Sequence, residues 1–257
     1  MARYATMEVP KSCRRAPLSD HLSRKELKQD KIKETLEHGA EAVFSHSQLT
    51  LAVLVVILVV VSGYGGWRIY TDRQTVQASA NFDAALKVYN ARVGGTPDPS
   101  DPTEPVYSDE AARAQDASVK FLAVADKYPK TNPGRLARYY AALCYEDLER
   151  HNQALEELKK LSSSSDKELA AMAQYQTATL YARTGKNEDA IKILRALADK
   201  PSVIVTKPLV LLDLAGILRQ TNPKEAITIY QQIKKDYPDT PIAEAADQGL
   251  SLLAPAS

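Results

Sequence analysis

The sequence predicts an all-α protein, in which a single N-terminal transmembrane helix is followed by an array of helical repeats and a C-terminal capping helix. Three observations predict this class: an apolar stretch without charged residues, alanines at nearly constant spacing, and apolar residues with helical rather than strand periodicity. We expect three regions: a cytoplasmic tail with a juxtamembrane helix (1–47), the transmembrane helix (48–70) and the repeat domain (71–257).

The first region is a polar tail of mixed charge. Ser23 and Glu26 have the spacing of a helix-capping box, so the juxtamembrane helix is predicted to begin there. Residues 1–47 contain nine basic and seven acidic side chains, which gives a net charge of +2. Attraction to anionic lipids is weak at this charge, so we favour a solvated helix over a lipid-binding or partner-binding one.

The transmembrane helix is predicted from a long uncharged stretch. No charged side chain occurs between Glu41 and Arg68, and the most apolar part, 49–67, has 19 residues. About 20 residues cross the hydrocarbon core of a bilayer, whereas a buried strand, the alternative, usually has about 4–8. Trp67, Arg68 and Tyr70 are predicted to lie at the membrane interface, which aromatic side chains favour.

Flanking basic residues predict the orientation of this span. Nine Lys and Arg side chains precede it, whereas Arg68 and Arg73 alone follow it before Lys87. This asymmetry favours a cytoplasmic N-terminus and an exported repeat domain. We expect the span to be retained rather than cleaved as a signal, because the tail before it is longer than a signal n-region.

Four alanines mark the repeat. They are separated by 37, 36 and 36 residues, and a large apolar residue follows each by four positions. The pairs are Ala117 and Phe121, Ala154 and Leu158, Ala190 and Leu194, and Ala226 and Tyr230. An alanine lets two helices approach closely, while the larger residue fills the groove beside it. This spacing predicts four helical units.

Further residues keep the same register. Ala142 and Ala178 stand twelve positions before a repeat alanine, and proline closes the first and last units in the sequences KYPKT and DYPDT. This pattern resembles the tetratricopeptide repeat, although the spacing exceeds its usual period of about 34. Arg138 and Ala141 also replace its Trp and Leu in the second unit. An unrelated helical bundle is the alternative, which four alanines in register disfavour.

Two segments fall outside the regular units. The first unit, whose helices are expected at 76–92 and around Ala117, is interrupted by a proline-rich insertion at 93–109. Dense proline excludes a helix there, and we interpret the segment as a surface insertion, with a partner-docking loop as the alternative. A final helix from Pro241 to Leu253 is predicted to cap the last unit.

The sequence lacks a catalytic or metal-binding constellation. It contains no phosphate loop, GxSxG or HExxH motif, and a net charge of +1 argues against bulk nucleic-acid binding. Cys144 is predicted to be buried, and Glu156 and Glu157 to form a solvated helix face with Lys159 and Lys160. We therefore expect a non-enzymatic protein with protein partners and no metal, cofactor, nucleic acid or small-molecule substrate.

Partner binding is expected on the first helix of each unit. In helical-repeat arrays these helices line the inner face, and tyrosines and aliphatic residues flanked by charges suit an extended or helical peptide. The predicted partner-binding residues are Leu136, Tyr139, Leu143, Glu146, Asp147, Met172, Tyr175, Arg183, Leu218 and Arg219. The alternative is that these residues pack only against neighbouring units.

The whole arrangement resembles a bacterial family of inner-membrane tetratricopeptide-repeat-like proteins that act as ancillary subunits of the Sec translocon. The resemblance covers about residues 34–254 and is clearest in GGWRIY (65–70), ASANFDAAL and YPDTPIAEAA (237–246). It implies a single-pass protein of the bacterial inner membrane with periplasmic repeats. Translocon subunits, periplasmic chaperones or exported chains would then be its partners.

The long tail and the proline-rich insertion depart from the pattern of that family. Two other functions therefore stay open. One is a periplasmic organiser of cell-envelope or division complexes, and the other is a regulator that signals through its cytoplasmic tail.

Overall fold

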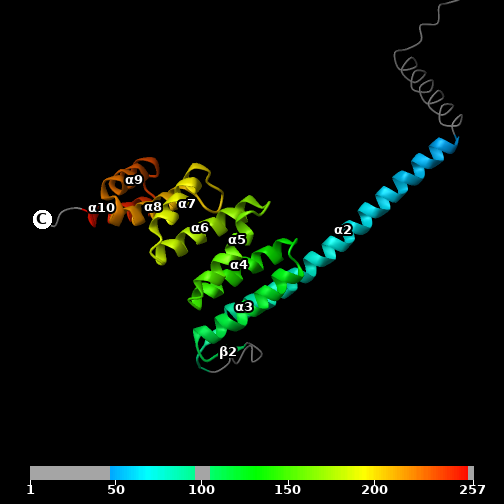
Figure 1. The fold of residues 1–257 in the computed structure, drawn as a ribbon, viewed down its shortest axis with the longest axis horizontal. Coiled ribbons are helices and arrows are strands. Elements are labelled where there is room, and N and C mark those ends of the chain that lie inside the picture. Colours follow the sequence, from blue (N-terminus) through cyan, green and yellow to red (C-terminus); the bar gives the residue numbers. More distant parts are fainter. Residues whose placement is uncertain (1–46, 96–104, 254–257) are drawn as a thin grey trace, which may run out of the picture. The chain divides into compact units, whose positions relative to one another are not determined.

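The structure is a computed structural model that describes residues 47–95 and 105–253, and this part of the chain contains nine α-helices and one pair of two-residue strands (Figure 1). The chain divides into two compact units, residues 1–67 and 68–257. The predicted all-α class is confirmed. The tail, including the helix predicted to begin at Ser23, lies outside the described residues.

Helix α2 (Ser47–Tyr89) is continuous over 43 residues. It joins the predicted transmembrane helix (48–70) to the helix expected at 76–92, which ends three residues earlier than predicted. The linking residues contain neither glycine nor proline, so nothing interrupts the helix. The hydroxyls of Thr71 and Thr75 donate to the carbonyl oxygens of Arg68 (2.8 Å) and Thr71 (3.0 Å), within the same helix.

The first part of α2 exposes an unbroken apolar surface. Every large apolar side chain from Leu51 to Tyr70 is exposed, for example Leu58 at 67% and Trp67 at 63%. Among the described residues, α2 is the one helix that is long and apolar enough to cross a membrane, judged by length and composition. Exposed apolar surface of this extent marks a lipid or protein contact, and the crossing itself stays a prediction.

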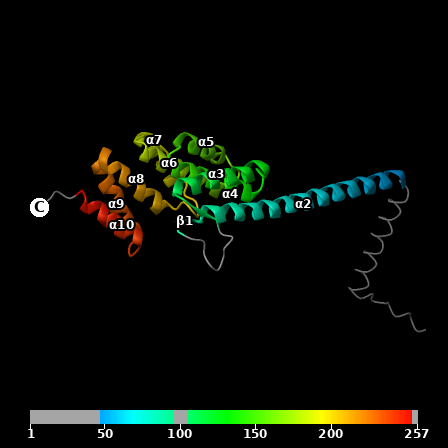
Figure 2. The same ribbon diagram turned by 90° about the horizontal axis from the view of Figure 1, so that it is seen from below.

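The repeat helices follow one another along the second unit (Figure 2). Their bounds are α3 (Glu110–Lys127), α4 (Asn132–Asp147), α5 (His151–Ser162), α6 (Lys167–Arg183), α7 (Asn187–Asp199), α8 (Lys207–Thr221), α9 (Pro223–Asp236) and α10 (Pro241–Ser251). The four repeat alanines fall on α3, α5, α7 and α9, and all have 0% exposure. The large residues four positions later are 0–3% exposed, which confirms the predicted packing.

The Tyr-Pro-x-Thr sequences end one helix and begin the next. The carbonyl oxygen of Tyr128 accepts a hydrogen bond from the Thr131 hydroxyl (2.9 Å), and that hydroxyl oxygen accepts the Gly134 N–H (3.1 Å) at the start of α4. Tyr237 and Thr240 repeat this arrangement before α10. A threonine at the N-cap satisfies a helix N–H that has no partner within its helix.

Arg138 connects three helices through two ion pairs. From α4, its guanidinium donates to Glu157 of α5 (2.6 Å) and to Asp126 of α3 (2.7 Å). Glu157 is 8% exposed and also pairs with Lys160 (2.6 Å). The prediction that Glu157 belongs to a solvated helix face is therefore wrong, because its carboxylate faces Arg138 rather than water.

The ends of the proline-rich insertion are joined by a short ladder. Strand β1 (Arg92–Val93) pairs in parallel with β2 (Val106–Tyr107), and Arg92 lies opposite Val106. The Tyr107 hydroxyl bonds to the carboxylate of Asp116 on α3, so the second strand is also held to the array. Residues 96–104, the middle of the predicted insertion, lie outside the described residues.

Helix α10 covers the end of the last repeat, in the place predicted for a capping helix. It packs on α9 and α8, and Ala246 is completely buried there. Gly249 lies directly on the ring of Tyr230, since a Cβ at this position would be 2.4 Å from Cζ of that ring. The contact requires a residue without a side chain.

We expect Gly249→Ala to lower the free energy of unfolding by about 1–3 kcal/mol, the usual cost of an added methyl in a packed interior. Tyr230 is 3% exposed, so its ring is enclosed by neighbouring atoms of the protein. Thermal unfolding of the full chain in detergent measures the effect. Gln248→Ala, at the exposed neighbouring position, should change stability by less than about 0.5 kcal/mol. Equal stability of both variants would contradict the close contact.

Candidate partner-binding face

The predicted partner-binding residues differ in how far they reach the surface. Asp147 and Arg183 are exposed, whereas Leu143 and Arg219 are half-buried. Leu136 and Tyr139 pack against the core between α4, α5 and α6, and Met172 and Tyr175 pack against the C-terminal core. Leu218 is 3% exposed and Glu146 is 5% exposed, so Leu218 belongs to the core rather than to an open surface.

Glu146 forms the polar link between the second and third units. Its carboxylate accepts two bonds from the Gln176 side-chain amide (2.9 and 3.1 Å) and one from Arg183 (3.2 Å). Burial raises the pKa of Glu146, and the bonds from Gln176 and Arg183 only partly oppose this. The arrangement brings together two of the predicted residues, because Arg183 forms an ion pair with Glu146 inside the array.

Tyr175 forms the corresponding link between the third and fourth units. Its hydroxyl on α6 bonds to the carboxylate of Asp213 on α8. Burial raises the pKa of both groups, and the hydrogen bond lowers that of Asp213 in part. The first helices α4, α6 and α8 are therefore connected in sequence by polar side chains, of which Glu146 is buried and Tyr175 and Asp213 are half-buried.

Tyr139 occupies a largely dry position on α4. Its ring meets that of Tyr140 edge-on, with centroids 6.1 Å apart. Burial, and then the nearby Glu146 carboxylate, raise the pKa of its phenol to about 12. The hydroxyl is therefore neutral at physiological pH. Most of the Tyr139 ring packs against the core below the surface of α4.

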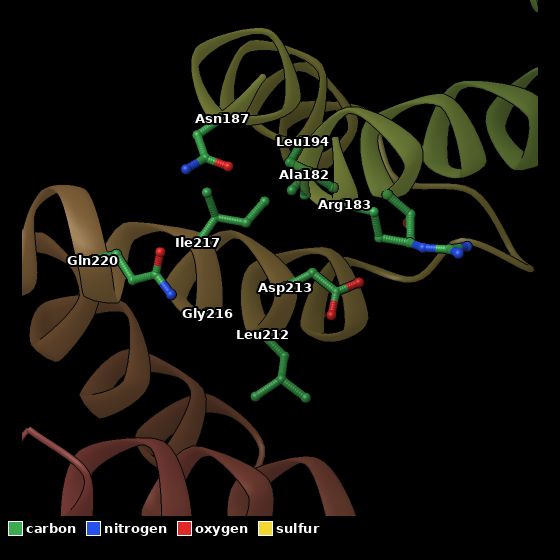
Figure 3. Close-up of a pocket in the computed structure, with 10 residues that line it drawn as sticks. Ala182, Arg183, Asn187, Leu194, Leu212, Asp213, Gly216, Ile217 and Gln220 are labelled. Atoms are coloured by element: carbon green, nitrogen blue, oxygen red, sulfur yellow. The ribbon is translucent and has the colours of Figure 1, made fainter. Parts of the chain in front are cut away.

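A cleft opens between the third unit and α8 (Figure 3). We call it the α6–α8 cleft, and its volume is about 310 Å³. The residues that line it are Thr179, Ala182, Arg183, Asn187, Leu194, Leu212, Asp213, Gly216, Ile217 and Gln220. In Figure 3, Asn187 extends from α7 toward Ile217 of α8, and Arg183 and Asp213 lie at the other end.

Most of the α8 residues in this cleft were not predicted from the sequence. The two residues predicted on α8 were Leu218, which is 3% exposed, and Arg219, which is half-buried. The turns before α5 and α7 have three residues, 148–150 and 184–186, whereas Asn222 alone separates α8 from α9. The α8 residues that line the cleft include Gly216, Ile217 and Gln220. Pro223 at the start of α9 marks the shorter turn and was the available signal that this unit departs from the regular spacing.

The interface residues predicted on α2 are exposed. Trp67 is 63% and Tyr70 is 62% exposed, and the rings of Tyr64 and Trp67 have centroids 6.1 Å apart. Arg68 is also exposed. Aromatic and basic side chains grouped at the end of an apolar stretch are typical of a membrane–water boundary.

No group of three metal-ligating side chains occurs within residues 47–95 and 105–253. Cys144 is completely buried, as predicted, and burial raises the pKa of its thiol to about 12. A thiol in this state is a poor nucleophile.

Comparison with protein families agrees with this geometry. A family model described as "Tetratricopeptide repeat-like domain" matches residues 45–203, and one described as "Tetratricopeptide repeat" matches residues 209–240. The first match alone covers more than half of the chain. No curated protein and no solved structure matches. The tetratricopeptide-like character predicted from the alanine spacing is confirmed.

Stability at alkaline pH should depend on Tyr139. Its folded-state pKa of about 12 lies above the ordinary value of 10.0. The stabilisation from its neutral phenol is therefore complete below pH 10 and is lost as the pH rises through about 12. We expect Tyr139→Phe to make stability fall less steeply across this interval, as measured by denaturant unfolding at several pH values. Identical slopes for the two proteins would contradict the burial of this hydroxyl.

Proposed function

We propose that this chain, which belongs to the tetratricopeptide repeat-like domain family, is a membrane-anchored scaffold that binds other proteins without catalysing a reaction. Repeat arrays of this kind present extended surfaces for protein partners. The observation that carries the proposal is the coupling of such an array, in one chain, to a helix whose apolar side chains from Leu51 to Tyr70 are all exposed.

The finer proposal is an ancillary subunit of the Sec translocon in the bacterial inner membrane. The N-terminus would be cytoplasmic and the repeats periplasmic, where they would assist protein export or pass exported chains to periplasmic chaperones. Support comes from the resemblance of 65–70 and 237–246 to that family, and from the greater number of basic residues before the span. Internally paired polar groups on α4, α6 and α8 hold successive units together, which fits a surface that meets polypeptide.

Anchoring predicts that charges placed in the middle of the apolar part of α2 release the protein from membranes. Val55→Arg with Leu58→Arg should disfavour insertion by about 5–7 kcal/mol, since one central arginine costs about 2.5–3.5 kcal/mol. Alkaline extraction of membranes measures the released fraction. Val119→Arg, at an exposed position of α3, is the matched control and should leave the protein in the membrane fraction. Release of the unsubstituted chain under the same conditions would contradict anchoring.

The partner is tested by crosslinking from the exposed positions of the face. A photoreactive amino acid at position 147 or 183 should capture translocon subunits, periplasmic chaperones or exported chains in intact cells. The same group at position 244, an exposed residue of α10, is the control and should capture far less. Capture of cell-wall or outer-membrane assembly factors instead would overturn the translocon proposal in favour of an envelope organiser.

A further inference from the structure

Two adjacent aliphatic residues form an exposed apolar point on the loop between α7 and α8. Val203 is 84% exposed and Ile204 is 55% exposed. Within residues 47–95 and 105–253, Val203 is the most exposed large apolar side chain, including those of α2. Single exposed apolar residues are common on protein surfaces, whereas an adjacent pair on a loop forms a continuous convex point. We call residues 203–204 the loop tip.

Hydrogen bonds and a buried anchor fix the loop tip in its outward position. The Ser202 N–H donates to the carbonyl oxygen of Val205 (3.0 Å), and the Val205 N–H donates to the hydroxyl oxygen of Ser202 (3.0 Å). Val205 itself is 3% exposed and belongs to the C-terminal core. The exposure of the two preceding side chains is therefore imposed by the fold of the loop.

Glu168 pairs with the backbone of the loop tip. From the start of α6, its carboxylate accepts the N–H groups of Val203 (3.3 Å) and Ile204 (3.0 Å). Hydrogen bonds, first that from the Ile204 N–H, lower the pKa of Glu168, so the carboxylate stays ionised at neutral pH. A backbone donor that leaves water without a partner costs free energy. Since these two donors are already paired, the loop tip can enter an apolar environment without this cost.

Helix α2 enters the array beside the turn between α3 and α4. The Tyr128 hydroxyl at the end of α3 donates to Gln77 of α2 (3.4 Å) and accepts a bond from Asn81 (3.3 Å). Gln77 follows Tyr70, the last residue predicted at the membrane interface, by seven positions. Seven residues of helix span about 10 Å. This end of the array is therefore the one that faces the predicted interface along α2.

The loop tip belongs to the same end of the array. Arg138, in the first half of α4, pairs with Asp126 at the end of α3 and with Glu157 in the second half of α5. The turn between α3 and α4 and the turn between α5 and α6 thus lie on one side. Glu168 follows the second of these turns directly and bonds to the loop tip.

Two lysines flank the loop tip. Lys200 precedes Val203 by three positions and Lys207 follows Ile204 by three. Both are exposed, and neither side chain forms an ion pair within residues 47–95 and 105–253. Apolar side chains beside lysines suit shallow insertion into a bilayer with anionic lipids. A bilayer also accepts a convex apolar point without a shaped pocket, which favours lipid over a protein partner.

We propose that the loop tip inserts shallowly into the surface of the membrane that holds α2. Val203 and Ile204 enter the boundary between headgroups and acyl chains, and Lys200 and Lys207 bind lipid phosphates. The attraction from the lysines is small because Asp199 adjoins Lys200, so the apolar contact supplies most of the binding. This inference rests on the proposed membrane anchoring, to which it adds a second point of contact that restricts the tilt of the array.

The test uses the full chain with Cys13→Ser, reconstituted in vesicles of phosphatidylethanolamine and phosphatidylglycerol with brominated acyl chains. Val203→Cys carries a polarity-sensitive fluorophore, whereas the native Cys144 is completely buried and reacts poorly. Bromine should quench this fluorophore at least about threefold more strongly than the same fluorophore on Val119→Cys, since shallow insertion reaches the acyl boundary. Position 119 is the matched control, an aliphatic residue of α3 that is 57% exposed.

Further variants identify the contact. Ile204→Asp should reduce quenching at position 203 to that of the control, because a charge at the acyl boundary costs free energy, whereas Ile204→Leu should leave it unchanged. Lys200→Gln with Lys207→Gln should reduce quenching about twofold. Quenching at 203 no stronger than at 119, or unaffected by Ile204→Asp, would overturn the inference. A blue-shifted emission without quenching by bromine would indicate a protein contact and would overturn it as well.

A fluorophore on Ile57→Cys, within the apolar part of α2, separates this inference from the anchoring on which it rests. Strong quenching at position 57 with none at 203 would show that the loop-tip assignment is wrong while the anchoring stands. Absence of quenching at 57 would contradict the anchoring itself, and quenching at 203 would then still support a contact of the loop tip with lipid.

Discussion

Close contact between helices at the repeat alanines is the constraint on which the rest of the array depends. A residue larger than alanine on α3, α5, α7 or α9 would separate helices that now leave these positions with 0% exposure. Because every unit repeats this contact, successive first helices are brought within reach of one another. Glu146 can therefore bond to Gln176 and Arg183 of the next unit, and Tyr175 to Asp213 of the following one.

Much of this fold was predictable because it depends on local spacing. The alanines and the Tyr-Pro-x-Thr turns act within a few residues of themselves, so their roles follow from sequence alone. The continuity of α2 was harder to predict, since absence of a break is a weak signal. The burial of Glu157 also escaped prediction, because it depends on Arg138, which lies 19 positions earlier and on another helix.

The candidate site was predicted less completely than the fold. The α4 and α6 positions followed the repeat, and Arg183 does line the α6–α8 cleft. On α8 the same spacing selected Leu218, which is buried, in a unit whose turn is two residues shorter than its equivalents. Adjacent residues point about 100° apart around a helix axis. An error of one position is therefore enough to select buried residues in place of exposed ones.

The charged side chains of this face fall into two groups. Asp147 and Arg219 make no side-chain hydrogen bond or ion pair within residues 47–95 and 105–253. Glu146, Arg183 and Asp213 are engaged within the array, and burial raises the pKa of both carboxyl groups. Charged and uncharged contacts are therefore both available to a partner on this face. A partner that uses the charges already paired within the array would have to replace their present contacts, which lowers the net gain in binding free energy.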